Sequence, residues 1–267
     1  MATSDTRLAV LIDADNTSGA HAAAILEELA SFGTPTIKRA YGDWTTSNLN
    51  GWKDPLLRHA IQPMQQFANT RGKNSTDSAL IIDAMDLLYA GNLDAFALVS
   101  SDSDFTRLAT RLRESGKQVI GLGRRTTPAA LIAACDRFVF LEVLTSGGTG
   151  ASHADDDVAP DDADEVTPLP DLRTILTAAV DAASLEDGWA HLGAVGNHLQ
   201  KRDASFDPRN YGFGKLIALA RAQDYLDVEQ SGGNVTRVRL EPKPAEAEAR
   251  KTTARKSTAK KTGGRRG

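Results

Sequence analysis

Short, wholly apolar runs alternate with longer amphipathic stretches along the first half of the chain. The runs predict six strands, at residues 8–14, 36–43, 64–68, 95–101, 117–123 and 138–143. Apolar residues at helical spacing predict helices between them, at residues 22–32, 54–61, 76–90, 104–115 and 128–138. This alternation indicates an α/β domain, residues 7–144, with a mainly parallel sheet. Because the strands lack alternating polar residues, we expect helices to cover both faces of the sheet.

A second region with helical periodicity follows at residues 171–242. Three amphipathic stretches precede two short strand-like runs, at residues 171–184, 192–202, 209–223, 225–230 and 236–241. The sequence SGGN joins the two runs and is typical of a turn. Three helices followed by a hairpin predict a small winged-helix domain.

The charged residues are unevenly distributed behind a net charge of −4. Residues 145–170 contain seven acidic residues and no Lys or Arg, and we expect them to form a disordered acidic linker. Residues 243–267 contain nine basic residues against two Glu, which predicts a disordered basic tail. Such a tail can contact phosphate backbones, although it can also serve only to keep the chain in solution.

Other features of the sequence bear on the cellular setting. No run of about 18 uncharged apolar residues is present, so we expect no membrane contact. The first residues include acids and lack the basic-then-apolar plan of a secretory signal. Cys135 is the single cysteine, which excludes an internal disulfide, and its alanine-rich surroundings predict a small buried residue. We therefore expect a cytoplasmic protein, and its oligomeric state stays open.

Carboxylates lie where the predicted strands end. Asp13 ends the first strand, Asp102 and Asp104 follow the fourth, and Asp77 opens the helix 76–90 on the side of its apolar stripe. Ligands of parallel α/β sheets bind outside the carboxyl ends of the strands, so we expect these aspartates to converge. A group of carboxylates repels itself unless a cation neutralises it. Oxygen ligands with no nearby His or Cys indicate Mg²⁺ or Mn²⁺.

Each aspartate also has a structural interpretation. Asp102 or Asp104 could cap the next helix, and the serines of the same segment could cap it or orient the carboxylates. Asp77 suits the positive end of its own helix, and the residues after the first strand could form an ordinary turn. Asp83 lies on another side of the helix and is expected to be solvated or structural.

Three segments in this order resemble the NYN domain family, which belongs to the PIN-like nucleases: LAVLIDADN, KNSTDSALIIDAMDLL and FALVSSDSDFTRLATRLRESGKQVIGLG. The resemblance extends over essentially all of residues 7–144. It implies a Rossmann-like, PIN-like sheet and a metal-dependent endoribonuclease that hydrolyses RNA phosphodiester bonds with Mg²⁺ or Mn²⁺. It also implies catalytic roles for four aspartates and one amide, Asp13, Asp77, Asp102, Asp104 and Asn16, with the four aspartates as the metal ligands.

Basic and aromatic residues flank the same predicted edge. Lys73 matches the family's lysine before the helix acid, although Gly72 precedes that lysine here whereas the family commonly has a glycine after it. Lys73 and Arg71 are expected to contact RNA. The aromatic residues Tyr41, Trp44 and Trp52 could stack on single-stranded RNA, or they could simply pack at the rim.

Two other functions compete with the nuclease. The sequence LIDADNT also matches the start of haloacid-dehalogenase-type phosphatases, in which Asp13 would be the nucleophile and Asp15 the general acid. That interpretation leaves Asp77 without a role. The other alternative is a non-catalytic RNA-binding or adaptor protein that keeps the fold without turnover.

The C-terminal region contains the sequence FDPRNYGFGKL at residues 206–216. This motif and its flanks resemble the OST-HTH (LOTUS) domain, which implies RNA binding and, in some members, a protein partner. The residues expected to contact RNA there are Lys201, Arg202, Arg209, Tyr211 and Lys215. Tyr211 could instead only pack, and Arg209 could only shape the turn.

Overall fold

The computed structural model describes residues 6–67, 75–145, 168–231 and 235–241. The chain divides into two compact units, one made of residues 1–169 and 200–210 and the other of residues 170–199 and 211–267. Most of the predicted acidic linker, the predicted basic tail and the SGGN turn lie outside the described residues. The domain boundaries proposed from the sequence therefore stay a prediction.

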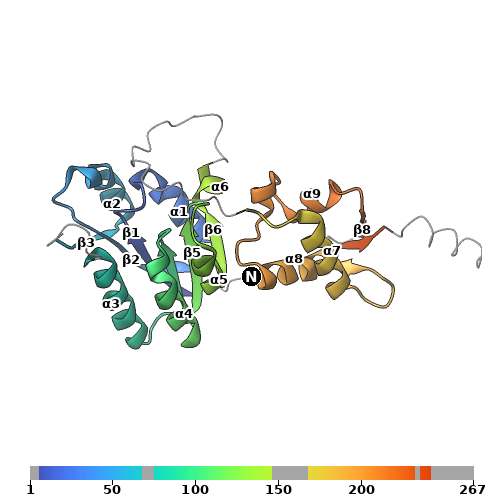
Figure 1. The fold of residues 1–267 in the computed structure, drawn as a ribbon, viewed down its shortest axis with the longest axis horizontal. Coiled ribbons are helices and arrows are strands. Elements are labelled where there is room, and N and C mark those ends of the chain that lie inside the picture. The colour runs from blue at the N-terminus through green and yellow to red at the C-terminus, as the bar shows by residue number, and fades with distance from the viewer. Residues whose placement is uncertain (1–5, 68–74, 146–167, 232–234, 242–267) are drawn as a thin grey trace, which may run out of the picture. The chain divides into compact units, whose positions relative to one another are not determined.

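A six-stranded parallel sheet forms the middle of the first unit (Figure 1). Its strands are β1 (Arg7–Asp13), β2 (Thr34–Gly42), β3 (Gln62–Gln65), β4 (Ala95–Val99), β5 (Gln118–Gly123) and β6 (Arg137–Phe140). The strand order is β3-β2-β1-β4-β5-β6 and every pair is parallel. The direction of winding reverses between β1 and β4, and ligands of such sheets bind at this switch point. The carboxyl ends of β1 and β4 therefore define the place to look for a site.

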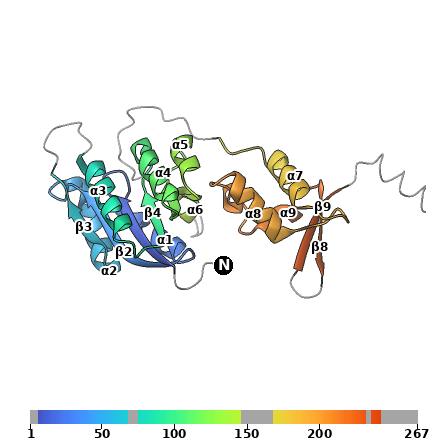
Figure 2. The ribbon, with the colours of Figure 1, turned by 90° about the horizontal axis from the view of Figure 1, so that it is seen from below.

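Helices cover both faces of this sheet, as the apolar strands predicted (Figure 2). The helices of the first face are α3 (Ser75–Tyr89), α4 (Thr106–Glu114) and α5 (Ala129–Ala134). Those of the second face are α1 (Ala22–Leu29), α2 (Lys53–His59) and α6 (Leu141–Thr145). Alternate strand residues enter the two cores. Leu11 and Leu98 face α3 and α4, whereas Val10 and Ala97 pack on the side of α1.

Two predicted strands differ in the structure. The strand predicted at residues 138–143 ends at Phe140, and α6 begins at Leu141. The other is β3. The apolar pattern placed it at residues 64–68, but β3 begins at Gln62 and ends at Gln65. Since β3 lies at the edge of the sheet, it tolerates Pro63 and needs few apolar residues. Short 3-10 helices lie in the loops of the sheet domain: η1 (Gly19–His21), η2 (Ser47–Trp52) and η3 (Ser103–Phe105).

The C-terminal region is a small helical and antiparallel domain, as predicted. Its elements are α7 (Leu172–Ala183), β7 (Ala190–His191), α8 (Leu192–Arg202), η4 (Pro208–Tyr211), α9 (Leu216–Arg221), β8 (Leu226–Ser231) and β9 (Val235–Leu240). The strands form a three-stranded sheet in the order β7-β9-β8. Leu176, Val195 and Leu219 bring one residue each from α7, α8 and α9 into the interior. Each helix among the described residues is too short or too polar to cross a membrane.

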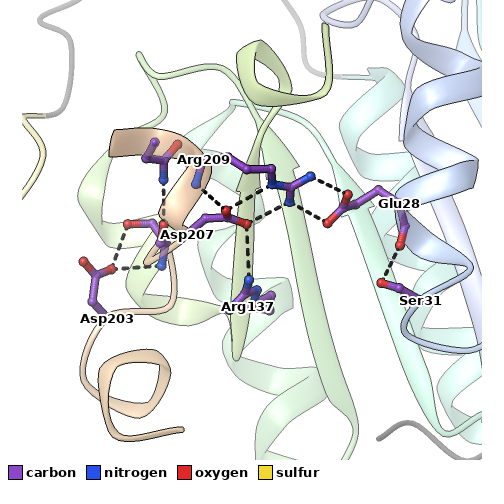
Figure 3. Close-up of polar contacts among 8 residues, drawn as sticks. Glu28, Ser31, Arg137, Asp203, Asp207 and Arg209 are labelled. Carbon is purple, nitrogen blue, oxygen red and sulfur yellow. Dashed lines mark hydrogen bonds and ion pairs between the residues drawn. The ribbon is translucent and has the colours of Figure 1, made fainter. Parts of the chain in front are cut away.

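The segment 200–210 belongs to the first unit and contributes to an ion-pair group there (Figure 3). The Arg209 guanidinium donates to both carboxylate oxygens of Glu28, on α1, at 2.8 and 2.9 Å. It also donates to Asp207 at 2.8 and 3.0 Å, and Asp207 accepts from Arg137 of β6 at 3.4 Å. Two carboxylates therefore occupy the side chain of Arg209, which the sequence had suggested as an RNA contact.

Candidate metal centre

Three carboxylates meet at the carboxyl end of the parallel sheet. Asp77, Asp102 and Asp104 each place one oxygen within 4.8 Å of the others. Asp77 lies in the first turn of α3, and the other two follow β4. Asp102 is also the cap of η3, because its Oδ1 accepts a hydrogen bond from the Asp104 backbone N–H at 2.8 Å. The capping interpretation and the proximity expected for a shared site therefore both hold for Asp102.

The electrostatics of this group act mainly on Asp77. Burial, followed by the charges of Asp13, Asp102 and Asp104, raises the pKa of Asp77 to about 6. Each of these causes penalises the ionised carboxylate. A bound cation would remove the repulsion and restore ionisation.

Asp13 lies beside this group without being part of it. Its side chain is only 1% exposed, and burial raises its pKa. Oδ2 accepts from the Asn16 side-chain amide and from the Ser100 hydroxyl, both at 2.8 Å. Oδ1 is buried and has no hydrogen-bond partner among the described residues. The four aspartates predicted to form one site are thus three grouped carboxylates and one buried neighbour with a free oxygen.

Two further hydroxyls organise the site through hydrogen bonds that the sequence did not predict. The Ser100 hydroxyl donates to Asp13 and accepts from the Asp102 backbone N–H at 3.1 Å, so it links the ends of β1 and β4. The Thr76 hydroxyl donates to Asp15 at 2.9 Å and links the β1 loop to α3. Ser100 is the first polar residue after the apolar run of β4, and this position is the signal that could have identified it.

The donor set fits a hard divalent cation. The three grouped carboxylates supply oxygen donors from α3 and the segment after β4. The free Oδ1 of Asp13 is a buried acceptor, and such groups are normally paired. Mg²⁺ and Mn²⁺ prefer oxygen ligands of this kind. These carboxylates can therefore hold a metal ion.

The aromatic residues near this edge are mostly interior. Trp52 is 2% exposed and its indole N–H donates to the Thr17 carbonyl oxygen at 2.9 Å. Trp44 is half-buried and donates to the Met64 carbonyl oxygen at 3.1 Å. The side chains of Trp52 and Trp44 therefore pack against the protein and do not form an open platform for stacking.

Tyr41 belongs to β2, within the strand predicted at residues 36–43, and it packs in the interior rather than stacking at an open rim. It is buried, and its hydroxyl donates to Asp83 of α3, which also accepts from Arg39. Burial, and then the hydrogen bond and charge of Asp83, raise the pKa of Tyr41. Asp83 is therefore structural and holds α3, the helix that carries Asp77, against β2.

The other predicted RNA contacts differ in their surroundings. Lys201, Arg202 and Lys215 are exposed. The Tyr211 hydroxyl donates to the Pro170 carbonyl oxygen at 3.0 Å. Arg71 and Lys73 lie outside the described residues.

Comparisons with solved structures and curated proteins find relatives without an assigned activity. A protein of unknown function from Vibrio parahaemolyticus is 22% identical, with a TM-score of 0.42 over 52% of this chain and 95% of that one. A Chromobacterium violaceum fragment is 36% identical, with a TM-score of 0.24 over 28% of this chain and 85% of its own. An uncharacterized protein of Methanocaldococcus jannaschii is 31% identical over 121 residues, or 44% of this chain. The chain spans only 47% of the length of that curated relative.

Family comparisons match both parts of the chain. Residues 7–142, a little over half of the sequence, match the NYN domain. Residues 168–238 match the OST-HTH/LOTUS domain. The first match covers the parallel sheet and the carboxylate group at its edge, and the second covers the helical and antiparallel domain. The chain therefore belongs to the NYN domain family and carries a C-terminal OST-HTH/LOTUS domain.

Proposed function

We propose that this protein is a metal-dependent endoribonuclease that hydrolyses RNA phosphodiester bonds. The observation that carries the proposal is the group of Asp77, Asp102 and Asp104, whose oxygens lie within 4.8 Å of one another. It lies at the switch point of a sheet whose family is PIN-like. Membership of the NYN family favours RNA as the substrate.

In this proposal the side chains at the site have different roles. Asp77, Asp102 and Asp104 would hold Mg²⁺ or Mn²⁺, which supplies Lewis-acid stabilisation of the phosphate and an activated water. The Oδ1 of Asp13 would be available to the same ion, since Asn16 and Ser100 bind only Oδ2. Asn16 therefore acts as a positioning residue for Asp13.

RNA binding is proposed for the OST-HTH/LOTUS domain and the basic tail. Lys201, Arg202 and Lys215 are exposed and can contact phosphates. A protein partner for this domain is the other option that its family leaves open.

The phosphatase alternative finds no support in the surroundings of Asp13. Its carboxylate is 1% exposed, which does not suit a nucleophile that attacks a free phosphomonoester. Asp15, the general acid of that mechanism, accepts a hydrogen bond from Thr76.

The test compares cleavage of labelled single-stranded RNAs by wild type and Asp102→Asn with Mg²⁺, with Mn²⁺ and with EDTA. Asn caps a helix about as well as Asp, so this substitution retains the cap and removes the charged ligand. We expect metal-dependent cleavage by wild type and a loss of at least about 100-fold in the variant. Asp86→Asn, on an exposed position of α3, is the matched control and should cleave normally. Equal cleavage by wild type and Asp102→Asn, or none by wild type, would overturn the proposal.

A further inference from the structure

Acidic residues lie at the carboxyl ends of four of the six described strands of the sheet, whereas β3 ends in glutamines and β5 is followed by arginines. Asp13 ends β1, Asp43 follows β2, and Asp102 follows β4. Basic residues directly follow a strand in one place among the described residues, where Arg124 and Arg125 come after β5. Among the residues that directly follow a described strand, those beside β5 are therefore the ones that offer a polyanion favourable charges.

Backbone contacts fix the position of Arg124. Its backbone N–H donates to the Ser101 hydroxyl at 2.8 Å, one residue before Asp102. Its carbonyl oxygen accepts from the backbone N–H and the hydroxyl of the buried Thr127. A Cβ on Gly123 would lie only 2.7 Å from the Ser100 carbonyl oxygen, so the two strand ends are closely packed. The turn that carries Arg124 is thereby held beside the segment that carries Asp102.

Arg125 extends the positive charge toward β6. Its backbone N–H donates to Glu142 at 2.9 Å, and its guanidinium lies 5.8 Å from the centre of the Phe140 ring. Both side chains are half-buried, and none of the ion pairs within the described part of the chain includes Arg124 or Arg125. Both are therefore available to an external anion although several carboxylates lie at the same edge.

We propose that Arg124 and Arg125 bind the backbone phosphates of single-stranded RNA next to the bond that is cut. The RNA would run from the carboxylates after β4 across the end of β5 toward β6. Neighbouring strands lie roughly 5 Å apart, which is comparable to the step between consecutive phosphates of an extended strand. Arginine suits this role because its planar guanidinium matches phosphate oxygens in a bidentate manner. This inference rests on the proposed nuclease function and names the path of its substrate.

The test uses the full chain carrying Arg124→Gln, Arg125→Gln or both. Because the hydrogen bonds of both residues are made by the backbone, glutamine retains them. Arg111→Gln is the matched control, since Arg111 lies in the last turn of α4, at the opposite edge of the sheet. Binding of single-stranded RNA is measured by fluorescence anisotropy over a range of salt concentrations, in an Asp102→Asn background that leaves the RNA uncut.

Each arginine substitution should flatten the plot of log affinity against log salt by about 0.7, the double variant by about 1.4, and Arg111→Gln by nothing. In the cleaving protein, KM should rise several-fold while kcat changes less than about twofold, because the lost contacts bind substrate and transition state alike. Slopes and KM values equal to those of Arg111→Gln would overturn the inference while leaving the nuclease proposal intact. Flattened slopes in a protein that cleaves no RNA would support the RNA path and refute the nuclease.

Discussion

Replacing Asp77 by Asn should stabilise the metal-free protein at neutral pH. In the folded chain, burial and the charges of neighbouring carboxylates raise the pKa of Asp77 to about 6. The unfolded chain loses that proton near 3.8, the ordinary value. The folded state therefore binds more protons between these two values, and wild-type stability falls as the pH rises through this window. The amide of Asn carries no charge and escapes this loss.

The stability that the variant gains can be calculated from the same difference in pKa. A change from 3.8 to about 6 corresponds to at most about 3 kcal/mol. The side chain is only half-buried, so screening by water reduces this to about 1–2 kcal/mol. The first turn of α3 favours a carboxylate by about 0.5 kcal/mol, which the variant loses. The net expectation is about 1 kcal/mol, or a rise in Tm of about 2–4 °C.

Scanning calorimetry in EDTA at pH 4.0 and pH 7.5 measures this effect. The variant should come close to wild type at pH 4.0, where the folded carboxyl is protonated and the unfolded one is about half ionised, and should clearly exceed it at pH 7.5. Asp86→Asn, on the same helix but exposed, should change Tm little at both values. Added Mg²⁺ should reverse the order, because binding to the folded state stabilises wild type and the variant lacks one ligand. A variant that is less stable than wild type in EDTA at pH 7.5 would refute the reasoning. So would a Tm difference between variant and wild type that is the same at both pH values.

Three other changes test separate parts of the structure. Trp52→Phe should cost about 1–3 kcal/mol of stability, since it leaves the buried Thr17 carbonyl unpaired; weaker RNA binding at unchanged stability would instead restore a stacking role. Gly121→Ala should cost about 1–3 kcal/mol, because the new Cβ would lie 2.4 Å from the Phe138 ring; unchanged urea unfolding would contradict this close packing. Deletion of residues 243–267 should weaken RNA binding and flatten its salt dependence, and an unchanged slope would exclude the tail from binding.

The sequence predicted the class of the fold because the strands are apolar enough to be recognised one by one. β1, β4 and β5 are buried along nearly their whole length, so helices on both faces followed directly. β3 was misplaced because an edge strand needs little apolar surface. The order of the strands, and with it the switch point between β1 and β4, comes from pairing between distant segments and is not a local property.

Some features of the candidate site were predictable from the sequence and others were not. The proximity of Asp77, Asp102 and Asp104 was predictable, since residues at the carboxyl ends of parallel strands and at nearby helix starts converge. The position of Ser100 after β4 marked it as a candidate, but its partner Asp13 and the burial of Trp52 depend on tertiary contacts and were not predictable. Arg209 was expected to contact RNA because it lies in the motif that resembles the OST-HTH (LOTUS) domain. Its contact with Glu28 joins residues too far apart in sequence to foresee.

The most direct test of a metal-dependent nuclease at these carboxylates is the rate of single-turnover RNA cleavage as a function of Mn²⁺ concentration. The rate should be zero in EDTA and saturate with Mn²⁺ for wild type. Asp77→Asn should need a higher Mn²⁺ concentration, because one of the grouped ligands is neutral. Cleavage that persists in EDTA, or an identical Mn²⁺ dependence for the variant, would contradict a metal centre at Asp77, Asp102 and Asp104.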